Sequence, residues 1–380
     1  MRSSTGVRDL FWGLGLLLWV MGLLRWPQEV IEAGQQGLTL CASTLIPSLF
    51  PFFVLSSLLV SLNLTRYPGR WLERAMKPLF GVSGSGASAL LLGMVGGYPV
   101  GAKTVAELYG SGQCTKPEAQ RLLLFCNNAG PAFFLGVVGG SILKSVKLGM
   151  LLWLCHMVSA LLLGFFAERL FPLRNCTIPR FSTAPCAKPT PSSAILFVDA
   201  VKKSFLSVLN ICAFVVLFGI LLTLCRLAGL FDLLTLSCTT VRSVDAVQSL
   251  FSGFIELSNG IASLPIRPLS LALPLAAFLL GWGGICVHCQ TVSVLSGSGL
   301  SVLPYLCAKL LHGLLSALLC MCISGLLPQA ITAMARDVIS QTNAPSLAPG
   351  LMLCAILALS ALLLLYIEKF KAGNRRKERI

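Results

Sequence analysis

Long apolar runs dominate this sequence and constrain what it can fold into. A chain that crosses a bilayer as a helix needs about 20 apolar residues, and runs of that kind lie at 10–26, 41–62, 148–168, 204–228, 268–286, 304–327 and 349–367. Only 11% of the residues are charged, whereas soluble domains carry roughly 25%. Because backbone in lipid must satisfy its own hydrogen bonds, such runs become helices. We therefore expect an all-α polytopic membrane protein.

Two further apolar stretches, 93–107 and 126–133, contain residues that interrupt helices. Irregular backbone at membrane depth is tolerated only where it is buried in protein or lines a wet cavity. Polar residues at that depth are costly and suggest function. We interpret the two stretches together as a solute site. The interrupting and amide residues are Gly97, Pro99, Asn127, Asn128, Gly130 and Pro131.

The first interrupted stretch also carries a charged pair. Pro99 is suited to the first position of a helix, which places Lys103 and Glu107 four residues apart on one face. Two interpretations stay open. The two side chains form an ion pair within the helix, or Lys103 and the free N–H groups near Tyr98 face an anion, as helix N-termini favour negative charge.

The second interrupted stretch leaves its own alternatives open. Asn127 and Asn128 could bind a carboxylate, a ring nitrogen or a coupling ion, or they could bond to neighbouring helices. Before them, Thr115 followed by Glu118 predicts a helix start with a capping box. Beyond them, His156 lies alone in an apolar run, either as a packing residue or as a proton relay.

The second half of the chain repeats the order of these features. Gly93 corresponds to Gly253, and the segment after Gly253 carries Glu256, Ser258 and Asn259. Paired interrupted segments in corresponding positions are typical of transporters whose site lies between two repeats. We therefore expect a two-fold repeat with interrupted or re-entrant helices.

The expected domain boundaries and membrane orientation rest on this pattern and on the loops rich in Lys and Arg. Loops rich in Lys and Arg favour the cytoplasmic side, so we expect both termini to be cytoplasmic. The expected parts are an N-terminal anchor span with an interfacial segment at 1–40, a first transport repeat at 41–170, a cytoplasmic linker at 171–203, a second repeat at 204–328, and an external loop, last span and basic cytoplasmic tail at 329–380.

Several function classes find no support in the residues. The net charge of +15 follows loop topology, so no nucleic-acid partner is expected. The 15 cysteines are scattered through apolar runs and suggest small buried hydrophobes. Cys286 and Cys289 with His288 lack the second ligand pair that structural zinc needs. No nucleophile–base pair or cofactor signature is present, and we expect no enzyme, no cofactor and no metal.

The motifs resemble those of the sporulation integral membrane proteins called the YlbJ or SpoVV family, within the nucleoside-recognition Gate group. The resemblance covers about 40 to 365 and rests on four motifs, namely Gly-Gly-Tyr-Pro-Val-Gly-Ala-Lys103 with Glu107, Glu118-Ala-x-Arg121, Phe125-Cys-Asn-Asn-Ala129 and Glu256-Leu-Ser-Asn-Gly260. It implies a spore-forming bacterium and movement of dipicolinic acid from the mother cell across the outer forespore membrane.

The resulting hypothesis is a transporter of a small organic anion, with dipicolinate as its substrate and the bilayer as its setting. Rival hypotheses are a nucleoside-type or cation-coupled carrier and a non-transporting membrane scaffold for spore assembly. A homo-oligomer or other sporulation membrane proteins remain open as partners. The residues expected to bind substrate are Tyr98, Lys103, Asn127, Asn128, Ser258 and Asn259, and those expected to couple or gate are Glu107, Glu256, Gly97, Pro99, Gly130 and Pro131.

Overall fold

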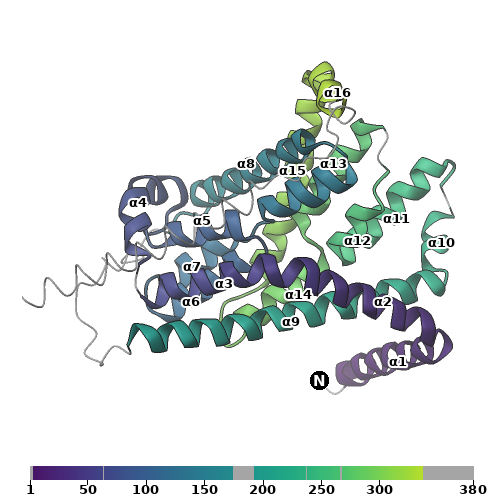
Figure 1. The fold of residues 1–380 in the computed structure, drawn as a ribbon, viewed down its shortest axis with the longest axis horizontal. Helices are drawn as coiled ribbons and strands as arrows, with labels where there is room; N and C mark the ends of the chain where they lie inside the picture. The colour runs from purple at the N-terminus through teal and green to yellow at the C-terminus, as the bar shows by residue number, and fades with distance from the viewer. Residues whose placement is uncertain (1–2, 63, 174–191, 237, 266–267, 337–380) are drawn as a thin grey trace, which may run out of the picture. The chain divides into compact units, whose positions relative to one another are not determined.

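A computed structural model describes residues 3–62, 64–173, 192–236, 238–265 and 268–336. The apolar run at 349–367 and the basic tail lie outside these residues. The described part of the chain is helical, with turns and short irregular segments and without strands (Figure 1). The protein is an all-α polytopic membrane protein, as the sequence predicted.

Several helices coincide with the apolar runs, and others lie in the stretches between them. Two of the helices, η1 and η2, are π-helical, and the others are α-helices. In chain order they are α1 (Ser3–Arg25), α2 (Pro27–Leu40), η1 (Cys41–Leu45), α3 (Ile46–Ser61), α4 (Arg66–Phe80), α5 (Gly86–Gly96), α6 (Val100–Gly110), α7 (Lys116–Leu123), η2 (Phe133–Ile142), α8 (Val146–Leu170), α9 (Ser193–Leu227), α10 (Leu230–Thr235), α11 (Val241–Ile255), α12 (Leu257–Ala262), α13 (Leu269–Trp282), α14 (Gly284–Leu295), α15 (Leu303–Leu326) and α16 (Pro328–Arg336).

Within the described residues, four helical segments are long and apolar enough to cross a membrane. They are α8, α9, the segment Leu269–Leu295 that contains α13 and α14, and α15. The helices α1 and α2 meet at a bend of 98° and would form a fifth span if they count as one. Helix α9 begins at Ser193, so the end of the linker expected at 171–203 is helical.

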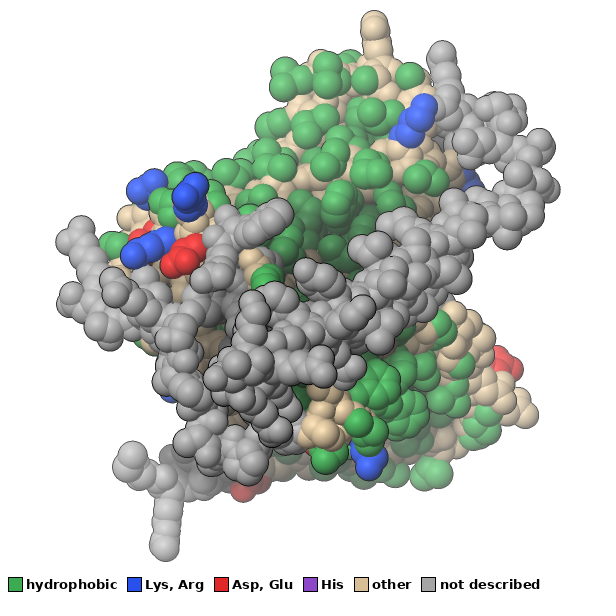
Figure 2. Space-filling view, turned by 60° about the vertical axis from the view of Figure 1, so that its left-hand side comes forward, with side chains coloured by type: hydrophobic (Ala, Val, Ile, Leu, Met, Phe, Trp, Pro, Cys, Tyr) green, Lys and Arg blue, Asp and Glu red, His purple; other side chains and the backbone are tan. Residues whose placement is uncertain are grey.

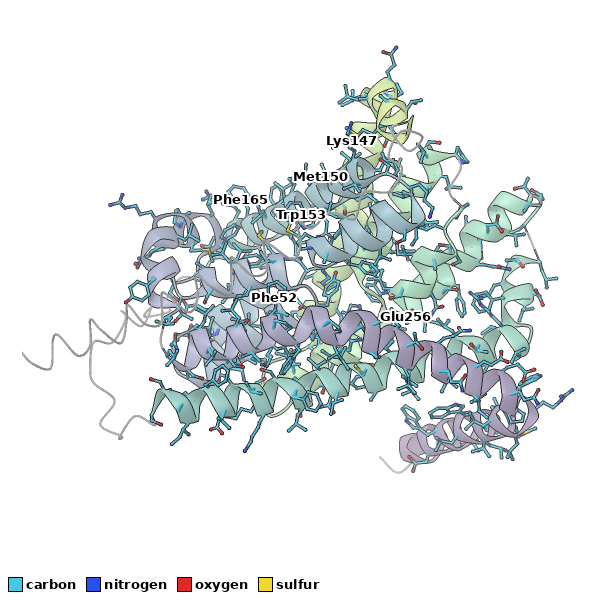
Figure 3. All side chains as sticks on the ribbon, viewed as in Figure 1. Phe52, Lys147, Met150, Trp153, Phe165 and Glu256 are labelled. Atoms are coloured by element: carbon cyan, nitrogen blue, oxygen red, sulfur yellow. The ribbon has the colours of Figure 1, made fainter. Side chains whose placement is uncertain are left out.

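The outward faces of these helices carry apolar side chains. On α8, Leu154 is 50% exposed and Val158 is 45% exposed, while Figure 3 labels Met150, Trp153 and Phe165 along the same helix. Hydrophobic side chains also spread over much of the described surface shown in Figure 2. Exposed apolar surface on this scale is unusual for a soluble monomer and is what lipid-facing helices present.

In the first half, two interruptions pack against each other. Helix α5 ends before Gly97, whose φ of 81° suits glycine, and a cis Tyr98–Pro99 peptide bond precedes α6. A Cβ on Gly97 would lie 3.0 Å from the backbone nitrogen of Gly130, in the irregular segment between α7 and η2. The predicted breaks at Gly97, Pro99 and Gly130 are therefore present, and they are adjacent.

The second half also pairs two breaks. Glu256 is extended between α11 and α12, and Gly283 separates α13 from α14. A Cβ on Gly284 would lie 3.1 Å from the carbonyl oxygen of Gly253 and from the backbone nitrogen of Leu257. Both halves thus bring two helix breaks together, although the two-fold repeat itself stays a prediction.

Candidate functional site

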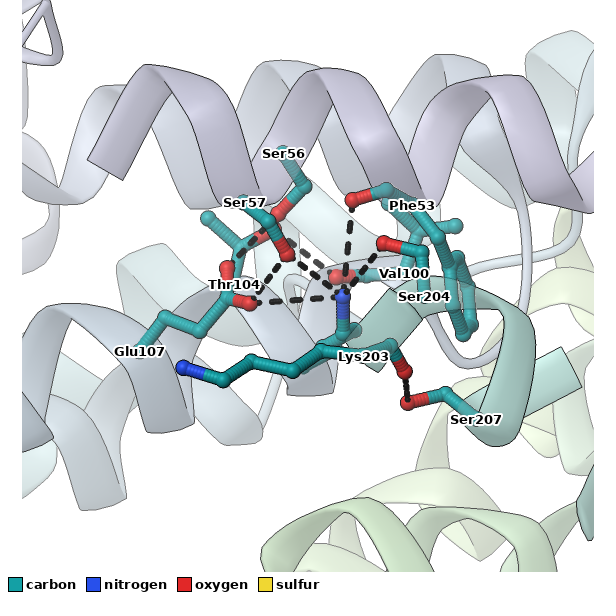
Figure 4. Close-up of polar contacts among 10 residues, drawn as sticks. Phe53, Ser56, Ser57, Val100, Thr104, Glu107, Lys203, Ser204 and Ser207 are labelled. Atoms are coloured by element: carbon teal, nitrogen blue, oxygen red, sulfur yellow. Dashed lines mark hydrogen bonds and ion pairs between the residues drawn. The ribbon is translucent and has the colours of Figure 1, made fainter. Parts of the chain in front are cut away.

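A buried polar cluster lies between α3, α6 and α9, and Figure 4 labels Ser57, Glu107 and Ser204 in it. Lys103 is at its centre. Its Nζ donates a 2.7 Å hydrogen bond to the hydroxyl of Ser57 and lies 3.3 Å from Oε1 of Glu107. The same carboxylate accepts hydrogen bonds from Ser57 at 2.7 Å and from Ser56 at 3.1 Å. Of the two interpretations that the four-residue spacing left open, the ion pair within α6 is therefore present, and two serines of α3 hydrogen-bond to it.

Lys103 and Glu107 line a polar cavity of about 510 Å³, which we call the lysine cavity. Lys203 of α9 also lines it, so the cavity wall carries two lysine ammonium groups and one carboxylate. Hydroxyl groups supply further donors. The other lining residues are Ala106, Tyr109, Gly110, Ser207, Ser293, Val294, Ser296, Gly297 and Ser298.

A second cavity, of about 170 Å³, lies where the breaks of the two halves meet, and we call it the Glu256 cavity. Most of its wall is apolar and includes Phe52 of α3, which Figure 3 labels together with Glu256. Its polar groups come from Tyr98, Glu256, Ser258 and Gln290. Gly97 and Gly130 complete the wall on the first-half side.

The carboxylate of Glu256 caps the N-terminus of α12. It accepts hydrogen bonds from the backbone N–H of Ser258 at 3.0 Å and of Asn259 at 2.8 Å, and from the side-chain amide of Asn259 at 2.8 Å. A negative charge at this position is stabilised by the free N–H groups and the dipole of the helix. Asn259 is itself exposed, and its side-chain amide here binds the Glu256 carboxylate.

The two predicted amides are buried in the core and line neither cavity. Asn127 donates from Nδ2 to the hydroxyls of Thr291 and Tyr305, both at 3.0 Å. It accepts from the backbone N–H of Ala102 at 3.4 Å, so it connects α6 of the first half with α14 and α15 of the second. Asn128 donates to the carbonyl of Phe125 at 2.8 Å, while its Oδ1 is buried without a partner among the described residues.

A cluster of basic side chains lies beside these amides. Lys309 of α15 donates to the carbonyl of Asn127 at 3.0 Å, and its Nζ lies 2.8 Å from Nδ1 of His312. The rings of His312 and His156 are 4.3 Å apart between centroids. His156 is therefore not alone, because folding brings a second histidine and a lysine against it.

The structure distributes the predicted site residues over three places. Lys103 and Glu107 line the lysine cavity, whereas Tyr98 and Glu256 line the other cavity with Ser258. Asn127 and Asn128 are buried and line neither cavity, and Asn259 is exposed. Pro99 precedes α6, and Pro131 follows Gly130 ahead of η2. The single combined site expected from the sequence is thus divided, and the roles of these residues stay predictions.

Lys309 and His312 did not enter the sequence-based site. A signal for them exists, since both are ionisable residues inside the apolar run 304–327, which is a reason to suspect function. They lie three residues apart and hence on one helix face. Ser56 and Ser57 carry no comparable signal, because hydroxyl groups are common in membrane helices.

The family is decided by comparison with known proteins. The pattern of the Gate family, described as nucleoside recognition, matches residues 42–145, a range that includes Lys103 and both amides. The sporulation integral membrane protein YlbJ of Bacillus subtilis (strain 168) is 31% identical over 318 residues, which is 78% of each chain. The chain belongs to the YlbJ family. The resemblance inferred from the motifs is thereby confirmed, and this YlbJ-family chain is a multi-pass membrane protein with a sporulation relative. No solved structure matches it.

Proposed function

We propose that this YlbJ-family protein is a membrane transporter of a small organic anion, with dipicolinate as its substrate. It moves dipicolinate from the mother cell across the outer forespore membrane during sporulation. The observation that carries the proposal is the lysine cavity, in which Lys103 and Lys203 stand against the single carboxylate of Glu107. Its YlbJ relative is a sporulation integral membrane protein.

The cavity suits a small planar dianion. Lys103 is held in place by Ser57 and Glu107, so its charge is positioned before any ligand arrives. Lys203 adds a second cation on α9, and the serines that follow α14 offer hydroxyl donors. Attraction between unlike charges is stronger at the edge of a protein than in bulk water, because the effective dielectric constant is lower.

The test is uptake of labelled dipicolinate into liposomes that hold the purified protein. Replacing Lys203 by Ala should raise the dipicolinate concentration needed for half-maximal uptake. Lys202→Ala is the matched control, since Lys202 is also exposed on α9 but does not line the cavity. Absence of saturable uptake by folded wild-type protein would overturn the proposal and favour a scaffold.

A second candidate, a nucleoside-type or cation-coupled carrier, rests on the Glu256 cavity. Its apolar wall with one carboxylate and the amide of Gln290 suits a cation or a neutral polar ring better than a dianion. The description of the Gate family, nucleoside recognition, points the same way. This candidate predicts that nucleosides are transported, that Glu256→Gln abolishes their uptake, and that dipicolinate neither enters nor competes.

A further inference from the structure

The ammonium group of Lys309 lies in the protein core without a carboxylate beside it. The residue is 1% exposed, and no Asp or Glu among the described residues is placed to pair with it. Its Nζ contacts the Asn127 carbonyl, Nδ1 of His312 and the face of the Tyr98 ring, 5.0 Å from the centroid. A buried cation without a counter-charge is costly, so packing alone does not explain this lysine.

The hydrogen bonds assign donors and acceptors in the cluster. Nε2 of His312 lies 2.9 Å from the carbonyl oxygen of His156, which can only accept. Neutral His312 therefore carries its proton on Nε2 and offers Nδ1 as an acceptor. The 2.8 Å contact between Lys309 and His312 then joins a protonated amine to a basic ring nitrogen. One proton can sit on either atom of this pair.

The other titratable groups seen to face the pair among the described residues are histidines and tyrosines, with no carboxylate among them. They are His156 of α8, His288 of α14, Tyr98 at the break before α6, and Tyr305 on α15 itself. Helix α13, which packs closely on α15, contributes no titratable side chain. The charge of the Lys309–His312 pair is therefore not fixed by a neighbouring acid.

The same cluster holds the interrupted backbone between α7 and η2. Lys309 binds the carbonyl of Asn127, and Nε2 of His156 accepts a 3.3 Å hydrogen bond from the N–H of Ala129. The next residue, Gly130, packs against Gly97 and lines the Glu256 cavity. Lys309 binds Asn127, and Gly130, three residues further along the chain, lies where the breaks of the two halves meet. A change of charge on Lys309 therefore affects the backbone at that meeting point.

We propose that the Lys309–His312 pair is the proton-binding site through which this protein couples transport to a proton gradient. The pair binds one proton while it is open to one side of the membrane and releases it when it is open to the other. Protonation strengthens the hydrogen bond from Lys309 to the Asn127 carbonyl. It thereby favours one position of the interrupted backbone between α7 and η2. This inference rests on the proposed function, since it names what drives the same transport cycle.

The test compares two transport modes in the same proteoliposomes. The first is counterflow, the exchange of labelled for unlabelled dipicolinate at equal pH, and the second is accumulation driven by a pH difference. Lys309→Met and His312→Gln should retain counterflow and lose the accumulation that the pH difference drives. Glutamine at 312 keeps one donor and one acceptor but does not titrate, so it carries the test if Lys309→Met fails to fold. Lys116→Met, which removes an exposed lysine on α7, should accumulate like wild type.

The outcomes separate the two proposals. Counterflow by wild type together with gradient-driven accumulation that is unchanged in the variants would overturn the proton site and leave the transporter intact. Wild-type counterflow with no effect of the pH difference would do the same. Absence of counterflow in folded wild type would overturn the transporter itself. As an independent readout, adding dipicolinate to weakly buffered wild type should change the pH reported by an indicator dye, and this change should vanish in His312→Gln.

Discussion

The hydroxyl of Tyr98 donates a 2.8 Å hydrogen bond to the carbonyl of Leu280. This bond joins the break between α5 and α6 to the last turn of α13, where carbonyl groups lack partners further along the helix. The same ring faces Lys309 and lines the Glu256 cavity. Tyr98 therefore links the first half, the second half and the basic cluster.

Tyr98→Phe tests this link without changing the ring. Loss of the bond should lower the free energy of unfolding by about 0.5–1.5 kcal/mol, because the Leu280 carbonyl loses a buried donor. Thermal unfolding in detergent, followed by tryptophan fluorescence, measures the change. An unchanged transition would show that water or a shifted neighbour replaces the hydroxyl.

Gly101→Ala tests the close approach of two backbones. A Cβ at this position of α6 would overlap the carbonyl oxygen of Cys126, and backbone cannot move aside as a flexible side chain can. We expect a loss of about 1–3 kcal/mol or more. The control is Gly219→Ala in α9, where a Cβ meets nothing within 4 Å; it should be neutral or stabilising by roughly 0.5–1 kcal/mol. Equal effects of the two substitutions would contradict the packing of the first-half breaks.

Lys103 and Glu107 should be coupled energetically. Glu107→Gln leaves the buried ammonium of Lys103 without its carboxylate and should destabilise the protein by about 1–3 kcal/mol, less than for a fully buried pair because the Glu107 side chain is 25% exposed. Adding Lys103→Met should recover part of the loss. A double-mutant cycle on unfolding free energies measures the coupling, expected at about 0.5–3 kcal/mol. A coupling near zero would mean that Ser56 and Ser57 satisfy each charge separately.

Glu256 should stabilise α12 through its charge and through its capping bonds. Glu256→Ala removes both and should cost about 0.5–2 kcal/mol, whereas Glu256→Gln keeps a capping oxygen and should cost less. Hydrogen exchange at the amides of Ser258 and Asn259, followed by mass spectrometry, reports the cap directly. If Gln were as damaging as Ala, the charge would matter more than the hydrogen bonds.

Local chemistry made much of the fold predictable. The apolar runs at 148–168 and 304–327 became α8 and α15 within two residues at each end, because helices satisfy their own backbone in lipid. The capping box at Thr115 and Glu118 begins α7 as expected. The breaks at Gly97 and Gly130 were visible because glycine and proline end helices wherever the chain places them.

Assembly of the site depended on contacts that are distant in sequence. The sequence by itself determined a polytopic helical protein and its family motifs, and it placed Lys103 and Glu107 on one helix face, since these depend on composition and on spacing along one helix. The structure then showed which of the two open interpretations of that pair holds, namely the ion pair. Only the tertiary structure placed Lys203 beside Lys103, separated Tyr98 from both, and set Lys309 and His312 against Asn127 and His156. The physical reason is that each of these contacts joins helices from different parts of the chain, and periodicity within one helix carries no information about which other helix packs on its face.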